Sequence, residues 1–513
     1  MFFLLLVAIK PLLADTLKVM TEFAERFIPE VGKPGEACGL VGVYSNDRDG
    51  VEKVFVGMQA LQHRGQSGAG MLIFCEDGMA FGPKGKGLVG EVITDNIYRA
   101  LDFNQYGPAT IGHDRYATSG LENGNAGQLA QPIVAPSKEF GVAHNGHIEN
   151  IAKIAECFSC DVTETKSDSE ALTKLIDHVR ANNKGDLLKA VKKVMPHIDG
   201  AASLVMSDKE RLIAVRDRFG FRPLSIGKLE GKKNKYMVAS ETIAFDMAGA
   251  NFVRDIEPGE MVSIDKNGLH SYFFSKETED QLCSFEYVYF AHPNSNIRGK
   301  NVYQVREKLG ELLGERYPVG ADIVVGVQNS GAPYARGFAH KAGIYEELAL
   351  TKNPYVNRTF IKDRQMTREQ SVLLKHQPNR ALVEGKKIVL VDDSIVRGTT
   401  MKTIVQLLRN MGAVEIHTRI PSPPYAWPCF YGMDTRDTSM LLAYDKTKEE
   451  MADYLGVDTL EFLGVDDVLS VLDGLNSTAE QRAKGIGSLC MACMTGNYPT
   501  EIPVDLIGKK KHV

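Results

Sequence analysis

Two continuous apolar runs set the strongest limit on what this chain can fold into. Residues 321–327 (ADIVVGV) and residues 387–391 (KIVLV) each lead through a turn containing Gly and Ser into a helix-like stretch. Strands that are apolar along their whole length are typical of a parallel sheet whose two faces are both covered by helices. The second half of the chain is therefore predicted to be an α/β domain.

The first half follows a different pattern. Short β-rich runs such as residues 39–44 (GLVGVY) are bounded by turns, and residues 201–207 and 211–217 read as the two strands of a hairpin. Residues 169–180 (SEALTKLIDHVR) instead carry apolar side chains at helical spacing. Strand groups mixed with helix groups predict an α+β domain over residues 38–275.

Length and these pattern changes divide the chain into four segments. A chain of 513 residues is too long for one ordinary hydrophobic core. We expect a leader over residues 1–37, the α+β domain over 38–275, the α/β domain over 276–470 and a C-terminal tail over 471–513.

Charge and cysteine content restrict the partners and the compartment. The formal net charge of −5 provides no broad basic surface, so neither nucleic acid nor a membrane is expected as a partner. The eight cysteines are too sparse for a disulfide scaffold, which favours a reducing, cytoplasmic location.

The leader is apolar at its start but does not read as a membrane anchor. Residues 1–9 (MFFLLLVAI) lack a basic segment before them and are too short to span a bilayer. The alternatives are an extension that is removed, an early start codon with Met20 as a second start, and a signal peptide.

Residues 389–400 (VLVDDSIVRGTT) form the clearest candidate for a phosphate-binding loop. Backbone N–H groups at the start of the following helix can bind an anion without net positive charge. Asp392 and Asp393 can bind ribose hydroxyls or a metal-bound sugar, and residues 394–399 can surround a 5′-phosphate. The plainer alternative is an acidic strand end followed by a Thr helix cap.

Cys38 is the candidate nucleophile, although a lone Cys before a strand is more often a buried apolar filler. The segments that follow it change this interpretation. They are residues 63–66 (HRGQ), 112–118 (GHDRYAT), 144–146 (HNG) and 167–170 (SDSE). In order and spacing, they resemble the N-terminal-nucleophile (Ntn) glutamine amidotransferases, whose fold is a four-layer αββα arrangement.

This resemblance implies a role for each residue of the first site. Cys38 would attack the side-chain amide of glutamine, with its own α-amino group as the base once residues 1–37 have been removed. Asn145 and the Gly146 N–H would hold the oxyanion, while Arg115 and Asp168 would bind the α-carboxylate and α-ammonium of glutamine. The family commonly has Asn where His147 stands and Asp where Ser67 stands.

The loop around Asp392 resembles the phosphoribosyl pyrophosphate (PRPP) signature of type I phosphoribosyltransferases. Residues 328–331 (QNSG) stand where that fold binds pyrophosphate, with Asn329 in place of the usual Asp. Arg358 and Arg368 fall in a segment that resembles the family's closing loop. The resemblance implies that PRPP and its Mg²⁺ are bound by Ser330, Asp392, Asp393, Ser394, Ile395, Val396, Arg397, Gly398 and Thr399.

Four other cysteines form a candidate metal site. Cys490 and Cys493 make a CxxC pair, with Cys283 and Cys429 far upstream, and spacing alone allows Zn²⁺, an iron–sulfur cluster, a redox pair or no function. The surrounding residues resemble the cluster-bearing branch of the amidophosphoribosyltransferases. That resemblance implies a structural [4Fe–4S] cluster, with Zn²⁺ as the alternative.

The amidophosphoribosyltransferase resemblance extends over residues 38–505. It implies conversion of PRPP, glutamine and water to 5-phosphoribosylamine, glutamate and pyrophosphate, with ammonia passing through an internal channel near Tyr116. Purine nucleotides would inhibit, and the family is usually tetrameric. The rival hypotheses are a glucosamine-6-phosphate synthase, which shares the glutaminase but not the PRPP loop, and a PRPP-binding regulator without amide chemistry.

Overall fold

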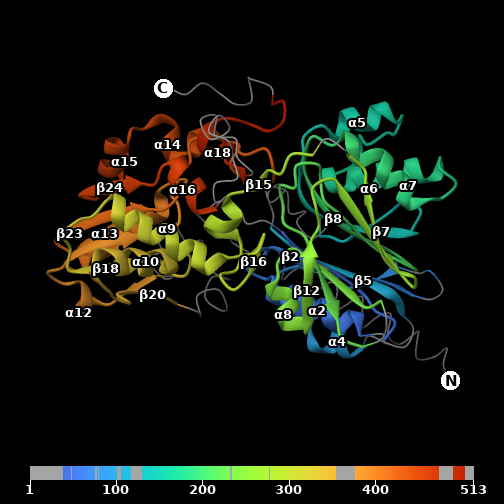
Figure 1. Cartoon of the computed structure of the whole chain (residues 1–513), viewed down its shortest axis with the longest axis horizontal. Coiled ribbons are helices and arrows are strands. Elements are labelled where there is room, and N and C mark those ends of the chain that lie inside the picture. Colours follow the sequence, from blue (N-terminus) through green and yellow to red (C-terminus); the bar gives the residue numbers. More distant parts are fainter. Residues whose placement is uncertain are drawn as a thin grey trace.

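The computed structural model describes most of the chain after residue 37. The described ranges are residues 38–47, 49–75, 78, 80–100, 106–116, 130–231, 234–275, 278–353, 376–472 and 489–502. Two halves lie side by side, the first coloured blue to green and the second yellow to red (Figure 1). Within these ranges, no helix combines the length and the apolar character needed to cross a membrane. The expected leader, Arg358 and Arg368 lie outside the described residues.

The first half is built on two antiparallel sheets. The first sheet has the order β12-β10-β11-β1-β5-β2-β3, with β4 also paired to β2. Its strands are β1 (Gly39–Tyr44), β2 (Gly68–Cys75), β3 (Ala80–Phe81), β4 (Lys84–Lys86), β5 (Tyr106–Arg115), β10 (Ser225–Leu229), β11 (Tyr236–Ala239) and β12 (Ala250–Asp255). The second sheet has the order β14-β13-β9-β8-β7-β6. Its strands are β6 (Ile133–Val134), β7 (Phe140–Ile148), β8 (Gly200–Asp208), β9 (Leu212–Val215), β13 (Glu260–Asp265) and β14 (Gly268–Phe273).

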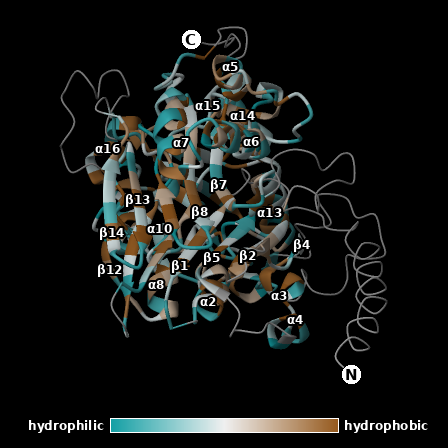
Figure 2. Ribbon diagram, turned by 90° about the vertical axis from the view of Figure 1, so that its right-hand side faces the viewer, coloured by the Kyte–Doolittle hydropathy of each residue, from teal (hydrophilic) through white to brown (hydrophobic). Residues whose placement is uncertain are grey.

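The two sheets pack face to face, and helices cover both outer faces. Leu40, Ile111 and Val205 belong to the buried cluster between the sheets. One outer layer holds α2 (Gly50–Ala60), α3 (Val89–Val92), α4 (Asp95–Ala100) and α8 (Ile243–Ala248). The other holds α5 (Ile151–Cys157), α6 (Asp168–Ala181), α7 (Leu187–Val194) and the short turn η5 (Met195–His197). This is the predicted αββα arrangement, and Figure 2 shows hydrophobic residues concentrated on the strands between these layers.

The second half contains a five-stranded sheet of order β19-β18-β22-β23-β24, in which every neighbouring pair is parallel. The strands are β18 (Ile323–Gly326), β19 (Tyr345–Glu346), β22 (Lys387–Val391), β23 (Glu415–Ile420) and β24 (Thr459–Phe462). On one side lie α9 (Val302–Arg316), α10 (Ala332–Ala342) and α16 (Val465–Leu472); on the other lie α13 (Thr399–Asn410) and α15 (Lys448–Leu455).

The packing of β22 on both of its faces explains why its sequence is a continuous run of apolar residues. Val389 and Val391 point into the core under α9 and α10, whereas Ile388 and Leu390 point into the core under α13 and α15. A strand that faces two cores has no position for a polar side chain. The predicted parallel sheet is confirmed, and the following helix α13 ends just before Gly412, which has a φ of 98°.

Short elements connect the two halves and complete the second half. The remaining elements are β15 (Leu282–Cys283), η6 (Glu286–Phe290), β16 (Asn296–Ile297), β17 (Lys300–Asn301), β20 (Leu350–Lys352), β21 (His376–Pro378), α12 (Arg380–Val383), η7 (Thr438–Met440), α14 (Leu442–Asp445), β25 (Leu489–Cys490) and α18 (Ala492–Thr495). The strand β15, which directly follows the first half, pairs in parallel with β25 from the C-terminal segment. The two segments that flank the α/β half therefore meet at one place.

Candidate active sites

Cys38, the predicted nucleophile, lies at the end of the first sheet where β1 begins and β5 finishes. Cys38 immediately precedes β1, and the register of β1 on β5 places Gly39 opposite Asp114, so that Arg115 lies at the same end of the sheet. The side-chain amide of Asn145 donates a hydrogen bond of 2.8 Å to the Cys38 carbonyl oxygen. Three predicted residues from distant parts of the sequence are thus brought together.

Gly146 and Asp168 lie next to this group. Gly146 has a φ of 139°, and a Cβ there would approach the Ala201 carbonyl oxygen to 2.0 Å, so this position requires glycine. Asp168 opens α6 and accepts backbone hydrogen bonds from Ile148 at 3.1 Å and Ser169 at 2.7 Å. Burial opposes ionisation, but nearby His144 and His147 and these bonds hold the pKa of Asp168 below its ordinary value. The carboxylate is therefore charged and suited to an ammonium group.

The thiol of Cys38 is not an activated thiolate in this arrangement. Burial raises its pKa above the ordinary value, while the guanidinium groups of Arg115 and Arg64 counteract that effect only in part. A protonated thiol needs a base before it can attack a carbonyl carbon.

The predicted phosphate loop connects β22 to α13 at the carboxyl edge of the parallel sheet. Asp392 and Asp393 are 2% and 0% exposed, and the Ser394 hydroxyl donates to the Asp393 carboxylate at 3.2 Å. Gly398 precedes the first turn of α13 with a φ of 74°. Ser394, Ile395 and Val396 are buried between these points, and Arg397 is half-buried. The loop thus leads directly to a helix N-terminus, which is a favourable anion site.

The predicted pyrophosphate loop lies beside it. The strands β18 and β22 are parallel neighbours with Gly326 opposite Val391, and the Val327 N–H donates to the Val391 carbonyl at 2.9 Å. Ser330 and the exposed Asn329 follow within the same turn. The two loops that the sequence assigned to one substrate therefore leave the same edge of the sheet.

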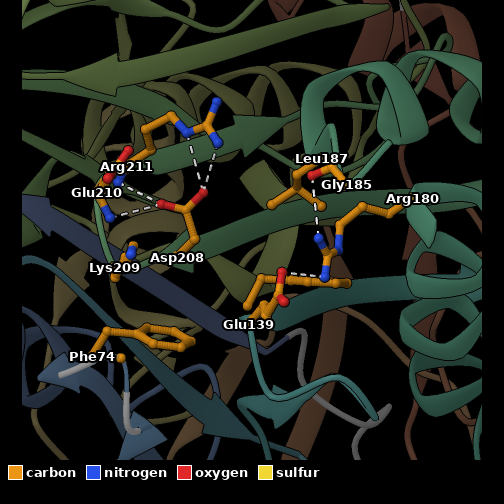
Figure 3. A pocket seen from close by; sticks show the side chains of 11 residues that line it. Phe74, Glu139, Arg180, Gly185, Leu187, Asp208, Lys209, Glu210 and Arg211 are labelled. Atoms are coloured by element: carbon orange, nitrogen blue, oxygen red, sulfur yellow. Dashed lines mark hydrogen bonds and ion pairs between the residues drawn. The ribbon is translucent and has the colours of Figure 1, made fainter. Parts of the chain in front are cut away.

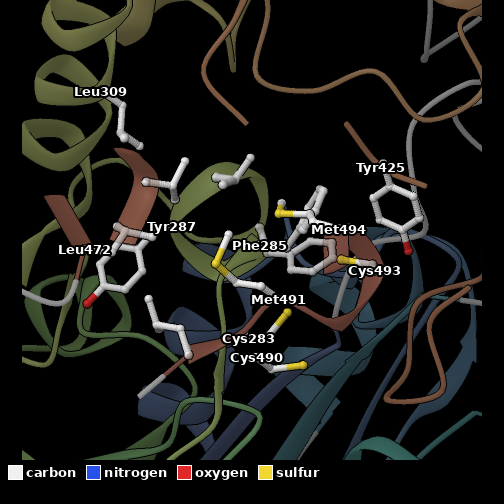
Figure 4. Packing of buried hydrophobic residues seen from close by; sticks show 14 of the residues in the cluster. Cys283, Phe285, Tyr287, Leu309, Tyr425, Leu472, Cys490, Met491, Cys493 and Met494 are labelled. Carbon is white, nitrogen blue, oxygen red and sulfur yellow. The ribbon is translucent and has the colours of Figure 1, made fainter. Parts of the chain in front are cut away.

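The four candidate cluster cysteines are gathered in one core. Cys283 pairs with Cys490 across β15 and β25, and both lie near Cys493 in one buried core (Figure 4). Cys429 belongs to the same core. None of the four is in a disulfide, and all are buried. Burial raises the pKa of Cys283 to about 11 and the pKa of Cys490 and Cys493 well above the ordinary value. In the described part of the chain, no three His, Cys, Asp or Glu side chains have the arrangement of a metal site.

The structure also places charged residues that the sequence did not indicate. Arg64, which belongs to the HRGQ segment, lies within a buried group containing Glu241, Glu286 and Arg222. Glu286 and Arg222 are far from Arg64 in the sequence and carry no local pattern, so only the tertiary structure could identify them.

Asp114, beside the predicted Arg115, is another residue of this kind. Its side chain is fully buried, and neither carboxylate oxygen has a hydrogen-bond partner among the described residues. A Cβ at Gly39 would lie 3.1 Å from one of these oxygens. Burial raises the pKa of Asp114 well above its ordinary value.

A separate cavity of about 330 Å³ opens on the first half (Figure 3). Its cations are balanced by neighbouring carboxylates, with Arg211 bound to Asp208 and Arg180 bound to Glu139. None of the predicted catalytic or PRPP-binding residues lines this cavity.

Models of two protein families match the two halves. The glutamine amidotransferase domain matches residues 115–247, and the phosphoribosyl transferase domain matches residues 298–421.

Similar proteins match over nearly the whole chain. An amidophosphoribosyltransferase of Bacillus subtilis (strain 168) is 40% identical over 94% of this chain and 98% of its own length. The chloroplastic amidophosphoribosyltransferase 2 of Arabidopsis thaliana is 38% identical over 93% of this chain and 81% of its own.

Solved structures agree with these matches. The B. subtilis glutamine PRPP amidotransferase complexed with ADP and GMP has a TM-score of 0.79 at 38% identity, covering 91% of this chain and 98% of that one. A structure described as the allosteric regulatory enzyme of purine biosynthesis has a TM-score of 0.81 at 38% identity, covering 92% and 98%.

Proposed function

The chain belongs to the amidophosphoribosyltransferase family, and on this premise we propose how its residues divide the reaction between two active sites. The enzyme catalyses the first step of purine biosynthesis, in which PRPP, glutamine and water give 5-phosphoribosylamine, glutamate and pyrophosphate. We assign the glutaminase to residues 38–275, the phosphoribosyltransferase to residues 276–470 and the cluster-bearing tail to residues 471–513.

In the glutaminase, Cys38 is the nucleophile. Its sulfur attacks the amide carbon of glutamine, and the resulting oxyanion is held by Asn145 and the Gly146 N–H. The C–N bond then breaks, ammonia leaves with the thiol proton, and water hydrolyses the thioester to glutamate. The protonated thiol needs a base, and the α-amino group of Cys38 supplies it after residues 1–37 are removed.

Arg115 and Asp168 orient the glutamine. The planar guanidinium of Arg115 suits the α-carboxylate of the substrate, and the ionised Asp168 suits its α-ammonium. Their position supports this assignment, because Arg115 lies at the same end of the first sheet as Cys38 and close enough to Asp168 for that carboxylate to act on its guanidinium.

In the phosphoribosyltransferase, residues 394–399 surround the 5′-phosphate of PRPP, and Asp392 and Asp393 face its ribose. Buried carboxylates at this edge are the donor type that Mg²⁺ accepts, so these residues and the PRPP oxygens would hold the ion. When bound, Mg²⁺ neutralises charge on the pyrophosphate. Ser330 and Asn329 contact the pyrophosphate, and Arg358 and Arg368 approach it when their segment closes.

A [4Fe–4S] cluster held by Cys283, Cys429, Cys490 and Cys493 is the proposed role of the cysteine core. The support for this proposal is that four buried thiols from three chain segments, none in a disulfide, share one core and are the ligand type of this group. The positive Arg222 also lies close enough to influence Cys283 and Cys429. When bound, the cluster would supply iron–thiolate bonds that cross-link the segments. Zn²⁺ is the alternative ion for the same residues.

Further properties are proposed from the family. Ammonia passes between the sites as the free base through a channel near Tyr116, and purine nucleotides inhibit. The relative from B. subtilis was solved with ADP and GMP, which supports nucleotide inhibitors here. We also propose a homotetramer in the cytoplasm.

The convergence of Cys38 with Asn145 and Arg115 carries the glutaminase assignment. The test combines the N-terminal sequence and intact mass of the active protein with PRPP-dependent release of glutamate. We expect a start at Cys38 and glutamate release. An active protein that retains residues 1–37 would contradict the assigned base, and PRPP binding without turnover by the processed form would favour the regulator.

A further inference from the structure

The carboxylate of Glu286 connects the phosphoribosyltransferase half to the glutaminase nucleophile. We infer that Glu286 is a positioning residue for glutamine cleavage, acting with Arg64, Arg222 and Gly432, so that docking of the second half completes the first site. This inference rests on the proposed role of Cys38 as the nucleophile.

The first branch of the connection leads from Glu286 to Cys38. Both carboxylate oxygens of Glu286 accept hydrogen bonds from Arg64, at 2.9 Å and 3.0 Å. The Nε of Arg64 then donates to the Cys38 carbonyl oxygen at 3.0 Å. A bidentate arginine–carboxylate pair fixes both the distance and the plane of the guanidinium. The position of the nucleophile's backbone is therefore set by a residue of η6.

The second branch leads from Glu286 towards the oxyanion residue. Arg222 donates to Glu286 at 3.2 Å and, through its other terminal nitrogen, to the Tyr431 carbonyl oxygen at 2.9 Å. The next residue, Gly432, lies against the glutaminase: a Cβ there would be 3.2 Å from the Gly146 carbonyl carbon. The backbone of the second half thus packs directly on the oxyanion glycine.

All the charges in this group are buried and balanced. The side chains of Arg64, Glu241 and Glu286 are 0% exposed and that of Arg222 is 1% exposed, which gives two cations and two anions. Glu241 also accepts a bond from the Ser295 hydroxyl at 2.6 Å, so this carboxylate too is held by both halves. Without solvent to screen them, such charges keep a narrow set of geometries.

A role limited to holding the fold together would look different. A purely structural network could end on any buried backbone group of the first half. The two branches of the observed network end at Cys38 and beside Gly146. Those residues are the ones that form and stabilise the tetrahedral intermediate in the proposed mechanism. A small displacement at either place changes the geometry of attack, and about 1 Å can cost about 100-fold in rate.

The test uses the fact that the two active sites can be assayed separately in the processed holoenzyme, which begins at Cys38 and contains both halves. Glutamine supports synthesis through both sites, whereas added ammonia needs only the phosphoribosyltransferase. We expect Glu286→Gln to lower kcat/KM for glutamine at least about tenfold, mainly through kcat, and to change ammonia-dependent synthesis by less than about twofold. The rate at which an electrophilic glutamine analogue labels Cys38 should fall by the same factor as glutamine turnover.

Two further variants separate positioning from stability. Glu260→Gln is the matched control, because Glu260 is equally buried and binds Arg254 through two bonds of 2.7 Å and 2.8 Å but does not contact Arg64 or Cys38. Gly432→Ala leaves every charge in place, so it decides the question if Glu286→Gln does not fold. It should reduce the glutamine reaction selectively. The iron content of each variant is measured to exclude loss of a cluster.

The outcomes are distinct. A selective loss of the glutamine reaction in Glu286→Gln or Gly432→Ala, absent from Glu260→Gln, supports the inference. Parallel loss of both reactions, or no loss in a folded variant, overturns it. Cys38→Ala is assayed alongside: if that variant still uses glutamine, the proposed function itself fails, whatever the other variants do.

Discussion

Replacing the buried Asp114 should stabilise the enzyme and change how its stability depends on pH. This carboxyl belongs to β5, has no hydrogen-bond partner among the described residues and lies beside Gly39. Burial raises its pKa well above the ordinary value, so the folded protein keeps it protonated at pH values where the unfolded chain has released the proton.

The sign of the effect follows from proton linkage. In the unfolded chain the carboxyl titrates near its ordinary pKa of about 3.9. Above that pH the folded state binds more protons than the unfolded state, so the free energy of unfolding falls as pH rises. The loss is about 1.4 kcal/mol per pH unit until the folded-state pKa is reached. Below about pH 4 the carboxyl is protonated in both states, so its titration no longer lowers the free energy of unfolding.

Two variants separate the titration from the buried polar group. Asp114→Asn removes the titration but keeps a polar side chain, whereas Asp114→Val also removes the unsatisfied group, which is worth a further gain of about 1–3 kcal/mol. Urea denaturation of the three proteins between about pH 5 and pH 8 measures both effects. Equal pH slopes in the wild type and Asp114→Asn, or a lower stability of Asp114→Val at the upper pH, would refute the reasoning.

Three other substitutions test the assigned sites. Cys38→Ala should abolish glutamine-dependent synthesis and leave ammonia-dependent synthesis within about twofold, because only the glutaminase uses the thiol; an equal loss of both would contradict this. Gly398→Ala should lower the free energy of unfolding by about 1–3 kcal/mol, since Gly398 has a φ of 74° and an added Cβ would lie 2.7 Å from Leu442. A Gly398→Ala variant with an unchanged free energy of unfolding and unchanged PRPP binding would contradict this prediction. Protein purified without oxygen should contain about four iron atoms per chain, and Cys429→Ser should lose them; zinc in place of iron would favour the alternative.

Local patterns were sufficient where a segment's structure depends on its own sequence. The apolar run of residues 387–391 predicted a buried strand followed by a helix, and both are confirmed as β22 and α13. The hairpin of β8 and β9 is also confirmed, with Met206 opposite Ile213. In each case, the periodicity of a few neighbouring residues determines burial.

Long-range contacts were beyond the reach of the same patterns. The pairing of β1 with β11, and the contact of Arg64 with Glu286, join residues that are far apart in the chain. Asp114 reads as an ordinary polar residue in sequence, and only its surroundings in the sheet show that it is buried. Charge networks of this kind depend on the docking of the two halves, so no local signal identifies them.

The pairing of Cys283 with Cys490 has a consequence for the order in which this protein can mature. The strand β15 is synthesised before the α/β half, whereas its partner β25 is synthesised after it. The glutaminase half can fold during synthesis, but the pairing partner of Cys283 is missing until β25 has been made. Nascent chains halted before β25 lack Leu489. They would therefore expose the side of Leu282 that Leu489 covers in the finished protein.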